Sequence, residues 1–131
     1  AVIPLFVKAI MNNTSAFING DGEQTRDFTY VENAVQVNIK GMLSKNAEAK
    51  NKVYNVAVGE NFSINFLYSF IKEYLKSDID PIRRGPREGD IRNSLADISL
   101  AKTLLGYQPT TDFKTGLVKT IEFFKDLYSQ K

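Results

Sequence analysis

The arginines of this sequence are placed where they could recognise an anion. Four of the five arginines lie in the ten-residue window 83–92, whereas the lysines are scattered along the chain. Arginine is preferred over lysine for planar, bidentate binding of phosphate or carboxylate groups. Glu88 and Asp90 share the window, so an arginine could hold the phosphates of a nucleotide while Asp90 accepts hydrogen bonds from the ribose. A solvated loop with local ion pairs is the alternative, because charged runs are usually solvent-exposed.

Composition narrows the chemistry that these residues could perform. The 131-residue chain has no cysteine and no histidine, which excludes disulfides, thiolate nucleophiles, cysteine or histidine metal sites and histidine-based catalytic triads. A net charge of +2 is too balanced for a general nucleic-acid binder. No apolar run approaches the roughly 20 residues needed to span a bilayer. An enzyme built from this chain would depend on carboxylates, lysine, tyrosine or a cofactor.

Glycine-rich phosphate-binding motifs are also absent from the sequence. Neither G-x-G-x-x-G nor a P-loop occurs in it. The segment NGDG at residues 19–22 could bring backbone amides to a ligand, but this composition is more typical of a tight turn. Phe6 and Phe17 could stack on a base, or could belong to the core, as aromatic residues at helical and strand spacing usually do.

Hydrophobic periodicity predicts interleaved helices and strands that would position these residues. Helices are predicted at residues 2–12, from 29 up to a polar loop at 45–52, at 64–76, at 97–105 and from 112 onward. Strands are predicted at residues 16–18, near 26–28, at 53–58 and at 80–84. With 43% hydrophobic residues the chain can bury a real core. The sequence therefore predicts a mixed α/β (α+β) domain of about four to five helices and several short strands, not a complete doubly wound sheet.

Local signals predict how some of these elements begin, end and pack. Thr29 with Glu32 forms a capping box ahead of an apolar stripe from residue 31 to residue 43, which predicts one buried helix face. The continuous run VYNVAV at residues 53–58 predicts a strand covered on both faces, as in a parallel sheet. Ser63 and Asp112 are predicted helix caps, and Gly106 is a predicted helix end.

Six stretches in a fixed order resemble a known family. They are AVIP at 1–4, FINGDG at 17–22 with TRDF at 25–28, YNVAVG at 54–59, REGDIR at 87–92, SLADIS at 94–99 and LLGYQP at 104–109. Their order and spacing resemble the C-terminal, substrate-binding part of extended short-chain dehydrogenases that act on nucleotide sugars. The resemblance covers essentially the whole chain, and it is strongest to the bacterial UDP-N-acetylglucosamine 4-epimerases that serve surface polysaccharide synthesis.

The resemblance implies a UDP-sugar site. Arg26 and Arg87 would bind the diphosphate, and Asp90 would hold the ribose. Residues near the nucleotide would be Val2, Phe6, Phe17, Ile18 and Asn19, with Ser63 and Asn93 as further candidates. Relatives often carry tryptophan at the Phe6 position and histidine at the Asn93 position, so this sequence departs from the family pattern at both.

The same resemblance implies an NAD-dependent 4-epimerase as the parent enzyme. NAD would take hydride from the sugar C4, and the 4-keto sugar would rotate and take the hydride back on its other face. The family's glycine-rich NAD loop and catalytic Tyr-x-x-x-Lys would precede residue 1. Tyr68 and Lys72 have that spacing by chance, as any amphipathic helix allows. We therefore expect residues 1–131 to be a single truncated domain without the N-terminal NAD-binding Rossmann domain, binding no cofactor and inactive alone.

The implied partners and location follow from the family. The ligand would be a UDP-sugar of the GlcNAc or GalNAc class, with no nucleic acid and no membrane, in the cytoplasm. The strand predicted at 53–58 would form part of a Rossmann sheet edge, and an uncovered edge predicts self-association. A related nucleotide-sugar dehydratase or decarboxylase is the alternative. A phosphate- or RNA-binding module is less favoured, because the window 83–92 contains no aromatic residue for stacking.

Overall fold

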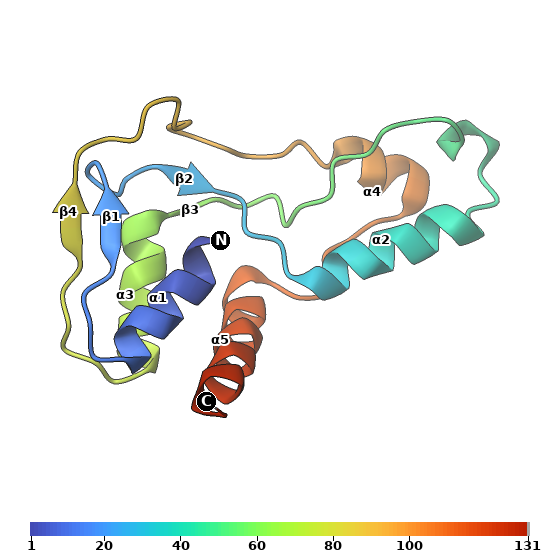
Figure 1. The fold of residues 1–131 in the computed structure, drawn as a ribbon. Coiled ribbons are helices and arrows are strands. Elements are labelled where there is room, and N and C mark those ends of the chain that lie inside the picture. The colour runs from blue at the N-terminus through green and yellow to red at the C-terminus, as the bar shows by residue number, and fades with distance from the viewer. Residues whose placement is uncertain (131) are drawn as a thin grey trace. The chain divides into compact units, whose positions relative to one another are not determined.

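The computed structural model describes residues 1–130. Its helices are α1 (Val2–Met11), α2 (Val31–Leu43), α3 (Ile64–Tyr74), α4 (Ser99–Leu105) and α5 (Phe113–Ser129), with a 3-10 turn η1 (Ala47–Ala49). Its strands are β1 (Phe17–Asn19), β2 (Thr25–Arg26), β3 (Phe62–Ser63) and β4 (Ile82–Arg84) (Figure 1). The predicted mixed α/β fold, with five helices and short strands, is confirmed.

The chain divides into two units that are interleaved along the sequence. Unit 1 consists of residues 1–26, residues 62–94 and the segment from Val118 onward, and unit 2 consists of residues 27–61 and 95–117.

Unit 1 contains all four strands. β1 and β4 run parallel, with Phe17 opposite Ile82 and Asn19 opposite Arg84 (Figure 1). β2 and β3 run antiparallel. Helices α1 and α3 lie side by side, and the rings of Phe6 and Tyr68 meet edge to face at 5.1 Å in the core between them.

Side-chain alternation along β1 divides its residues between core and solvent. Ile18 is fully buried, whereas Phe17 and Asn19 point away from the core. The predicted cap of α3 is confirmed, since the Ser63 hydroxyl oxygen accepts a hydrogen bond of 3.1 Å from the Phe66 N–H. β1 therefore presents Phe17 and Asn19 outward from a fixed position on the core.

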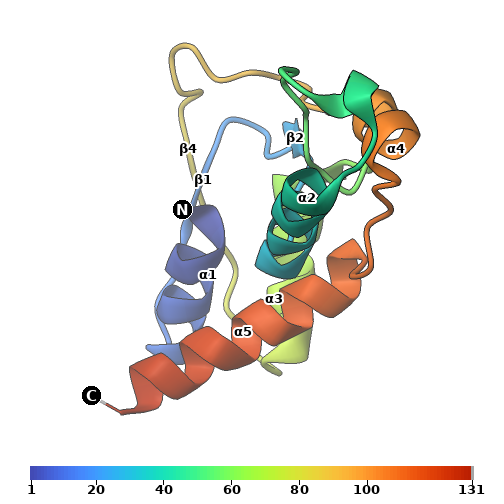
Figure 2. The same cartoon turned by 90° about the vertical axis from the view of Figure 1, so that its right-hand side faces the viewer.

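Unit 2 is built around a small apolar cluster of residues from several segments: Val37, Ala57, Ile98, Ala101 and Tyr107. Figure 2 shows α4 beside the 3-10 turn η1. Gly106 ends α4 in the left-handed conformation with φ of +60°, as predicted. The Asp112 carboxylate accepts a hydrogen bond of 2.9 Å from the Thr115 N–H, which confirms the predicted cap of α5.

The predicted strand at residues 53–58 is wrong. The segment is irregular, and Val53 is 90% exposed. A β-strand exists only through hydrogen bonds to a neighbour, and no segment of residues 1–130 offers one here. The β-branched residues at 53–58 favour a strand where a neighbouring strand is present, and without one the segment is irregular.

The predicted start and buried face of α2 are also wrong. The helix begins at Val31 after Tyr30, with no side-chain cap, and Glu32 accepts a hydrogen bond from the Thr111 hydroxyl at 3.3 Å instead. The buried residues of α2 are Asn33 and Val37. The predicted apolar stripe is exposed at Val31, Val35, Ile39, Met42 and Leu43. α2 turns a different face inward from the predicted one, because hydrogen bonds to Thr111 hold Asn33 in the core.

Candidate functional site

The ten residues that the sequence assigns to the substrate all fall in unit 1, although they span residues 2–93. They are Val2, Phe6, Phe17, Ile18, Asn19, Arg26, Ser63, Arg87, Asp90 and Asn93. Some of them line cavities, two form an ion pair with each other, and the others support the site without lining a cavity.

A first cavity of about 650 Å³ collects the residues expected near the base. Helix α1 contributes one wall and β1 another, with β4 and the loop after it closing the site. Among its lining residues are Val2, Phe6, Phe17, Asn19, Arg84 and Arg87. Phe6 is only 2% exposed, so its ring supports the cavity from within the core, whereas Phe17 is 47% exposed. Phe17 is therefore the aromatic residue that a ligand could reach.

A second cavity of about 450 Å³ lies at the NGDG turn. It is lined by Asn19, Gly20, Asp21, Gln24, Pro86, Arg87, Asp90 and Arg92. Asn19 and Arg87 line both cavities, so the two adjoin at these side chains. The NGDG segment forms the predicted turn, with Gly20 and Gly22 both at positive φ, and this turn also forms a wall of the second cavity.

Most of the arginines in the site already hold the loops in place. Arg92 forms an ion pair of 2.7 Å with the Asp21 carboxylate, and Arg83 donates to the Asp21 carbonyl oxygen at 2.8 Å. The hydrogen bond from Arg92, followed by that from the Glu23 N–H, lowers the pKa of Asp21 to about 2. These contacts fasten the NGDG turn to β4 and to the end of the 83–92 window.

Arg26 and Asp90, which were both expected to face the ligand, form an ion pair with each other. The Arg26 guanidinium also donates to the carbonyl oxygens of Thr25 at 2.7 Å and Ile91 at 2.6 Å. Gln24 donates to the other Asp90 oxygen at 3.3 Å. Asp90 lines the second cavity, whereas Arg26 lines neither, so their roles toward a ligand stay predictions.

Arg87 differs from these arginines because its guanidinium makes no hydrogen bond or ion pair within residues 1–130. It lies where both cavities meet. A free guanidinium where two cavities meet is suited to the phosphates of a ligand that extends into both.

Three of the predicted residues support the site from behind. Ile18 is buried in the core and can reach a ligand only through its backbone. Ser63 caps α3, and the Asn93 amide oxygen accepts a hydrogen bond of 3.3 Å from the Thr25 hydroxyl. Neither Ser63 nor Asn93 lines the two cavities.

Sequence reasoning missed Arg84 and Gln24 as individual site residues. A signal was present for Arg84, because a parallel pairing of the predicted strands 16–18 and 80–84 brings it next to Asn19. No local pattern marks Gln24, whose position depends on the path of the chain between β1 and β2.

Tyr68 and Lys72 have a structural role, as predicted. The Tyr68 hydroxyl donates to the Ile79 carbonyl oxygen at 3.0 Å, and its burial raises the pKa of the phenol. Lys72 forms an ion pair of 2.7 Å with Asp80. The two side chains hold the turn between α3 and β4.

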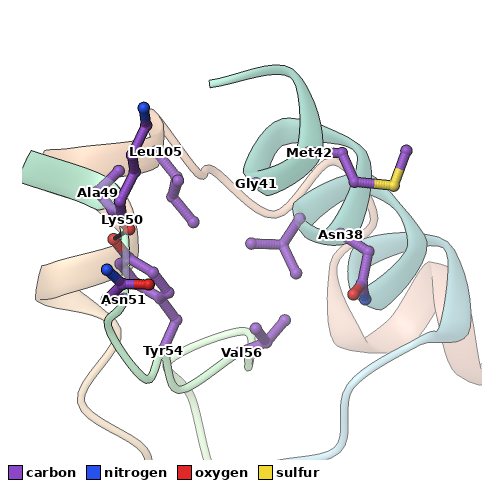
Figure 3. Close-up of a pocket in the computed structure, with 10 residues that line it drawn as sticks. Asn38, Gly41, Met42, Ala49, Lys50, Asn51, Tyr54, Val56 and Leu105 are labelled. Carbon is purple, nitrogen blue, oxygen red and sulfur yellow. Dashed lines mark hydrogen bonds between the residues drawn. The ribbon is translucent and has the colours of Figure 1, made fainter. Parts of the chain in front are cut away.

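Unit 2 has a cavity of its own, of about 720 Å³ (Figure 3). Asn38 and Met42 of α2 lie on one side of it, and Tyr54 and Leu105 lie on the other. None of the ten predicted site residues lines it. Within residues 1–130 there is no cluster of acidic side chains that could hold a metal ion. No helix in that part of the chain is long and apolar enough to cross a membrane.

Comparison with solved structures identifies proteins of the same fold. The UDP-N-acetylglucosamine 4-epimerase of Methanobrevibacter ruminantium M1, in complex with UDP-N-acetylmuramic acid, is 42% identical with a TM-score of 0.87, over 97% of this chain and 40% of that one. The UDP-glucose 4-epimerase of Thermotoga maritima, with UDP-glucose, is 32% identical with a TM-score of 0.90, over 98% and 40%. The UDP-glucuronic acid 4-epimerase of Bacillus cereus, in complex with UDP-glucuronic acid and NAD, is 28% identical with a TM-score of 0.91, over 98% and 40%.

The chain spans about 40% of the length of each of these proteins, and 39% of the first curated relatives that it matches. Residues 1–120 match the family described as GDP-mannose 4,6 dehydratase. This match covers most of the 131 residues. The chain therefore belongs to the GDP-mannose 4,6 dehydratase family, among the extended short-chain dehydrogenases that include the UDP-sugar 4-epimerases.

Proposed function

We propose that this chain forms the UDP-sugar-binding part of an NAD-dependent UDP-sugar 4-epimerase. The observation that carries the proposal is the position of Arg87, whose free guanidinium lies where two cavities meet. An aromatic base fits the first cavity beside Phe17. The ribose joins the base to the diphosphate, so it lies where the two cavities meet with its hydroxyl groups toward Asp90 and Gln24, and the Arg87 guanidinium holds the diphosphate.

The other predicted residues have supporting roles in this proposal. Val2 and Phe6 line the first cavity, and Asn19 lies where the base joins the rest of the ligand. Arg26 holds the Asp90 carboxylate and becomes a second diphosphate ligand if the ligand draws it away from Asp90. Ile18 contributes its backbone, while Ser63 and Asn93 fix the strands behind the site.

The three related structures support a UDP ligand, because they hold three different sugars that all carry UDP. We propose an N-acetylated sugar of the GlcNAc or GalNAc class, on the 42% identity to a UDP-N-acetylglucosamine 4-epimerase. Supply of such sugars to surface polysaccharide, in the cytoplasm, belongs to the same proposal.

NAD would supply the hydride acceptor and donor of the epimerisation. The sequence contains no G-x-G-x-x-G turn, so we assign no residue of this chain to NAD binding. The task of these residues is to hold the nucleotide of the substrate and so to position its sugar. We propose that residues 1–131 alone do not turn over, and epimerase activity of the purified chain would contradict this.

Calorimetric titration of the 131-residue chain with UDP tests the proposed site. We expect binding that Arg87→Ala and Asp90→Ala each weaken at least tenfold, since each removes a charge-assisted contact worth about 1.5–3 kcal/mol. Lys45→Ala is the matched control, because Lys45 is exposed and lines neither cavity. Absence of UDP binding by a chain whose circular dichroism shows it folded would contradict the proposal.

A nucleotide-sugar dehydratase is the alternative, and the family description favours it. If that description names the ligand of this chain, GDP should bind more tightly than UDP. The same titration with GDP therefore separates a GDP-sugar site from a UDP-sugar site. A guanosine preference would contradict the UDP-sugar proposal.

A further inference from the structure

The pairing of β1 with β4 creates a stack that sequence reasoning did not foresee. Asn19 lies opposite Arg84 in the parallel register, and Phe17 shares the outward face of β1 with Asn19. The Arg84 side chain reaches over the Phe17 ring, with its Cζ atom 3.2 Å from the ring centroid. Both residues line the cavity of about 650 Å³ in unit 1.

Arg84 is available to a ligand in a way that its neighbours are not. Arg83, the next residue, donates to the Asp21 carbonyl oxygen, and Arg92 is paired with the Asp21 carboxylate. The Arg84 guanidinium makes no hydrogen bond or ion pair within the part of the chain that the structure describes. One face of this planar cation rests on Phe17, and the residue is exposed.

The rest of the cavity combines apolar contact area with charge. Val2, Leu5 and Phe6 offer an apolar surface to a flat group, and Lys8 lines the same cavity. Arg87 supplies a free cation where this cavity meets the second one. Guanidinium planes are established stacking partners of nucleobases, and a ring beneath the guanidinium holds it in place.

We propose that Arg84 is a stacking platform for the base of the nucleotide, with Phe17 beneath it, so that Phe17, Arg84 and the base form three layers. This inference rests on the proposed nucleotide site and adds a residue that determines how much the base contributes to binding. Arg84 thus acts on the base, whereas Arg87 acts on the phosphates.

Comparison of two ligands separates these roles. UDP carries both the base and the phosphates, whereas inorganic pyrophosphate carries only the phosphates. The 131-residue chain is titrated with each ligand by calorimetry. Stacking of one base is expected to make UDP bind about 5- to 150-fold more tightly than pyrophosphate.

Arg84→Lys tests the stack because it keeps the positive charge and removes the planar group. We expect this variant to bind UDP about tenfold more weakly and pyrophosphate within twofold of the unmodified chain. Lys45→Ala, which lines neither cavity, is the control and should leave the ratio of the two affinities unchanged. Arg87→Ala should weaken both ligands.

The outcomes distinguish failure of this inference from failure of the proposed function. An Arg84→Lys variant with an unchanged affinity ratio overturns the platform and leaves the nucleotide site standing, whereas equal binding of UDP and pyrophosphate overturns both the platform and the proposed base site. A folded chain that binds neither ligand overturns both proposals. Selective loss of UDP affinity in Arg84→Lys establishes the platform.

Discussion

Arg26 and Asp90 form an ion pair across 64 residues of sequence, and Arg26 also donates to the Ile91 carbonyl oxygen at 2.6 Å. The end of β2 is thereby fastened to the loop that carries Arg87. Each side chain is 29% exposed, so water screens the pair only partly. The pair positions the loop in the unliganded chain, and it must open if Arg26 is to bind phosphate.

This pair should contribute measurably to stability. We expect Asp90→Asn to lower the free energy of unfolding by about 1–2 kcal/mol, because a partly buried, charge-assisted contact is lost. Urea denaturation measures the change. A double-mutant cycle with Arg26→Gln should show coupling of about 1 kcal/mol, and Asp126→Asn, at an exposed position of α5, is the control. Additive effects of the two substitutions would show that the pair contributes nothing.

The lowered pKa of Asp21 predicts acid sensitivity of the NGDG turn. Its pKa is about 2 in the folded chain against an ordinary 3.8, so the folded state binds this proton less readily than the unfolded state. The resulting stability is fully present above pH 3.8 and is lost as the pH falls toward 2. Arg92→Gln removes the main cause, so its stability should fall less steeply over that window. Denaturation midpoints between pH 5 and pH 2 measure both slopes, and parallel curves would refute the assignment to Arg92.

Two helical glycines should respond oppositely to alanine. A Cβ atom at Gly116 would lie 2.6 Å from the Tyr30 Cβ atom, whereas one at Gly41 would meet nothing within 4 Å. We expect Gly41→Ala to stabilise the chain by about 0.5–1 kcal/mol, the usual helix gain. Gly116→Ala should destabilise it by about 1–3 kcal/mol, because Tyr30 must move. Thermal unfolding compares the two variants, and a stabilising Gly116→Ala would show that Tyr30 moves freely.

Asn33 should be the polar residue of unit 2 that tolerates substitution least. Its side chain is 0% exposed. The amide oxygen accepts hydrogen bonds from the N–H groups of Thr110 at 3.0 Å and Thr111 at 3.1 Å. The amide nitrogen donates a hydrogen bond to the Thr111 carbonyl oxygen at 2.7 Å. Asn33→Ala leaves buried backbone groups without partners, which should cost about 2–4 kcal/mol. Asn38→Ala, at an exposed position of the same helix, should change stability by less than about 0.5 kcal/mol. Similar urea midpoints for the two variants would contradict this account.

Self-association stays a prediction, and it rests on the segment at residues 53–58, which pairs with no strand within residues 1–130. Its backbone makes no backbone–backbone hydrogen bond within residues 1–130. In an antiparallel pairing of two copies centred on Val56, Lys52 of each copy lies opposite Glu60 of the other, which is a favourable cross-strand pair. We expect sedimentation over a concentration series to show a dimer that Lys52→Glu weakens.

Charge reversal at both positions provides the control for this dimer. The double variant Lys52→Glu with Glu60→Lys restores opposite charges and should restore the dimer. Both side chains are exposed, so neither change should disturb the fold. A chain that stays monomeric at every concentration would refute self-association.

Local features were predictable from the sequence, and features that depend on distant partners were not. Ser63, Gly106 and Asp112 act on backbone groups within a few residues of themselves, so residue type and spacing identified them. The run at 53–58 had the right residues for a strand and lacked a neighbour. In α2 the hydrogen bonds of Asn33 to a segment almost 80 residues away turned the apolar stripe outward, which no periodicity reveals.

The candidate site shows the same division. The arginine window and the family resemblance led to Arg87 and to the cavity residues of α1 and β1. Neither could show that Arg26 and Asp90 bind each other, or that Arg84 lies on Phe17, because both contacts join segments more than 60 residues apart. Pairing between residues so far apart is decided by the path of the whole chain.

The interleaving of the two units has a consequence for how the chain reaches its native state. β1 and β4 are separated by more than 60 residues, and most of unit 2 lies in between. Such high contact order slows folding, since loop-closure entropy is lost before strand contacts compensate for it. We therefore expect the cavity at α1, β1 and β4 to be among the last parts to assemble during refolding. A nucleotide that binds this cavity should therefore lower the unfolding rate more than it raises the folding rate.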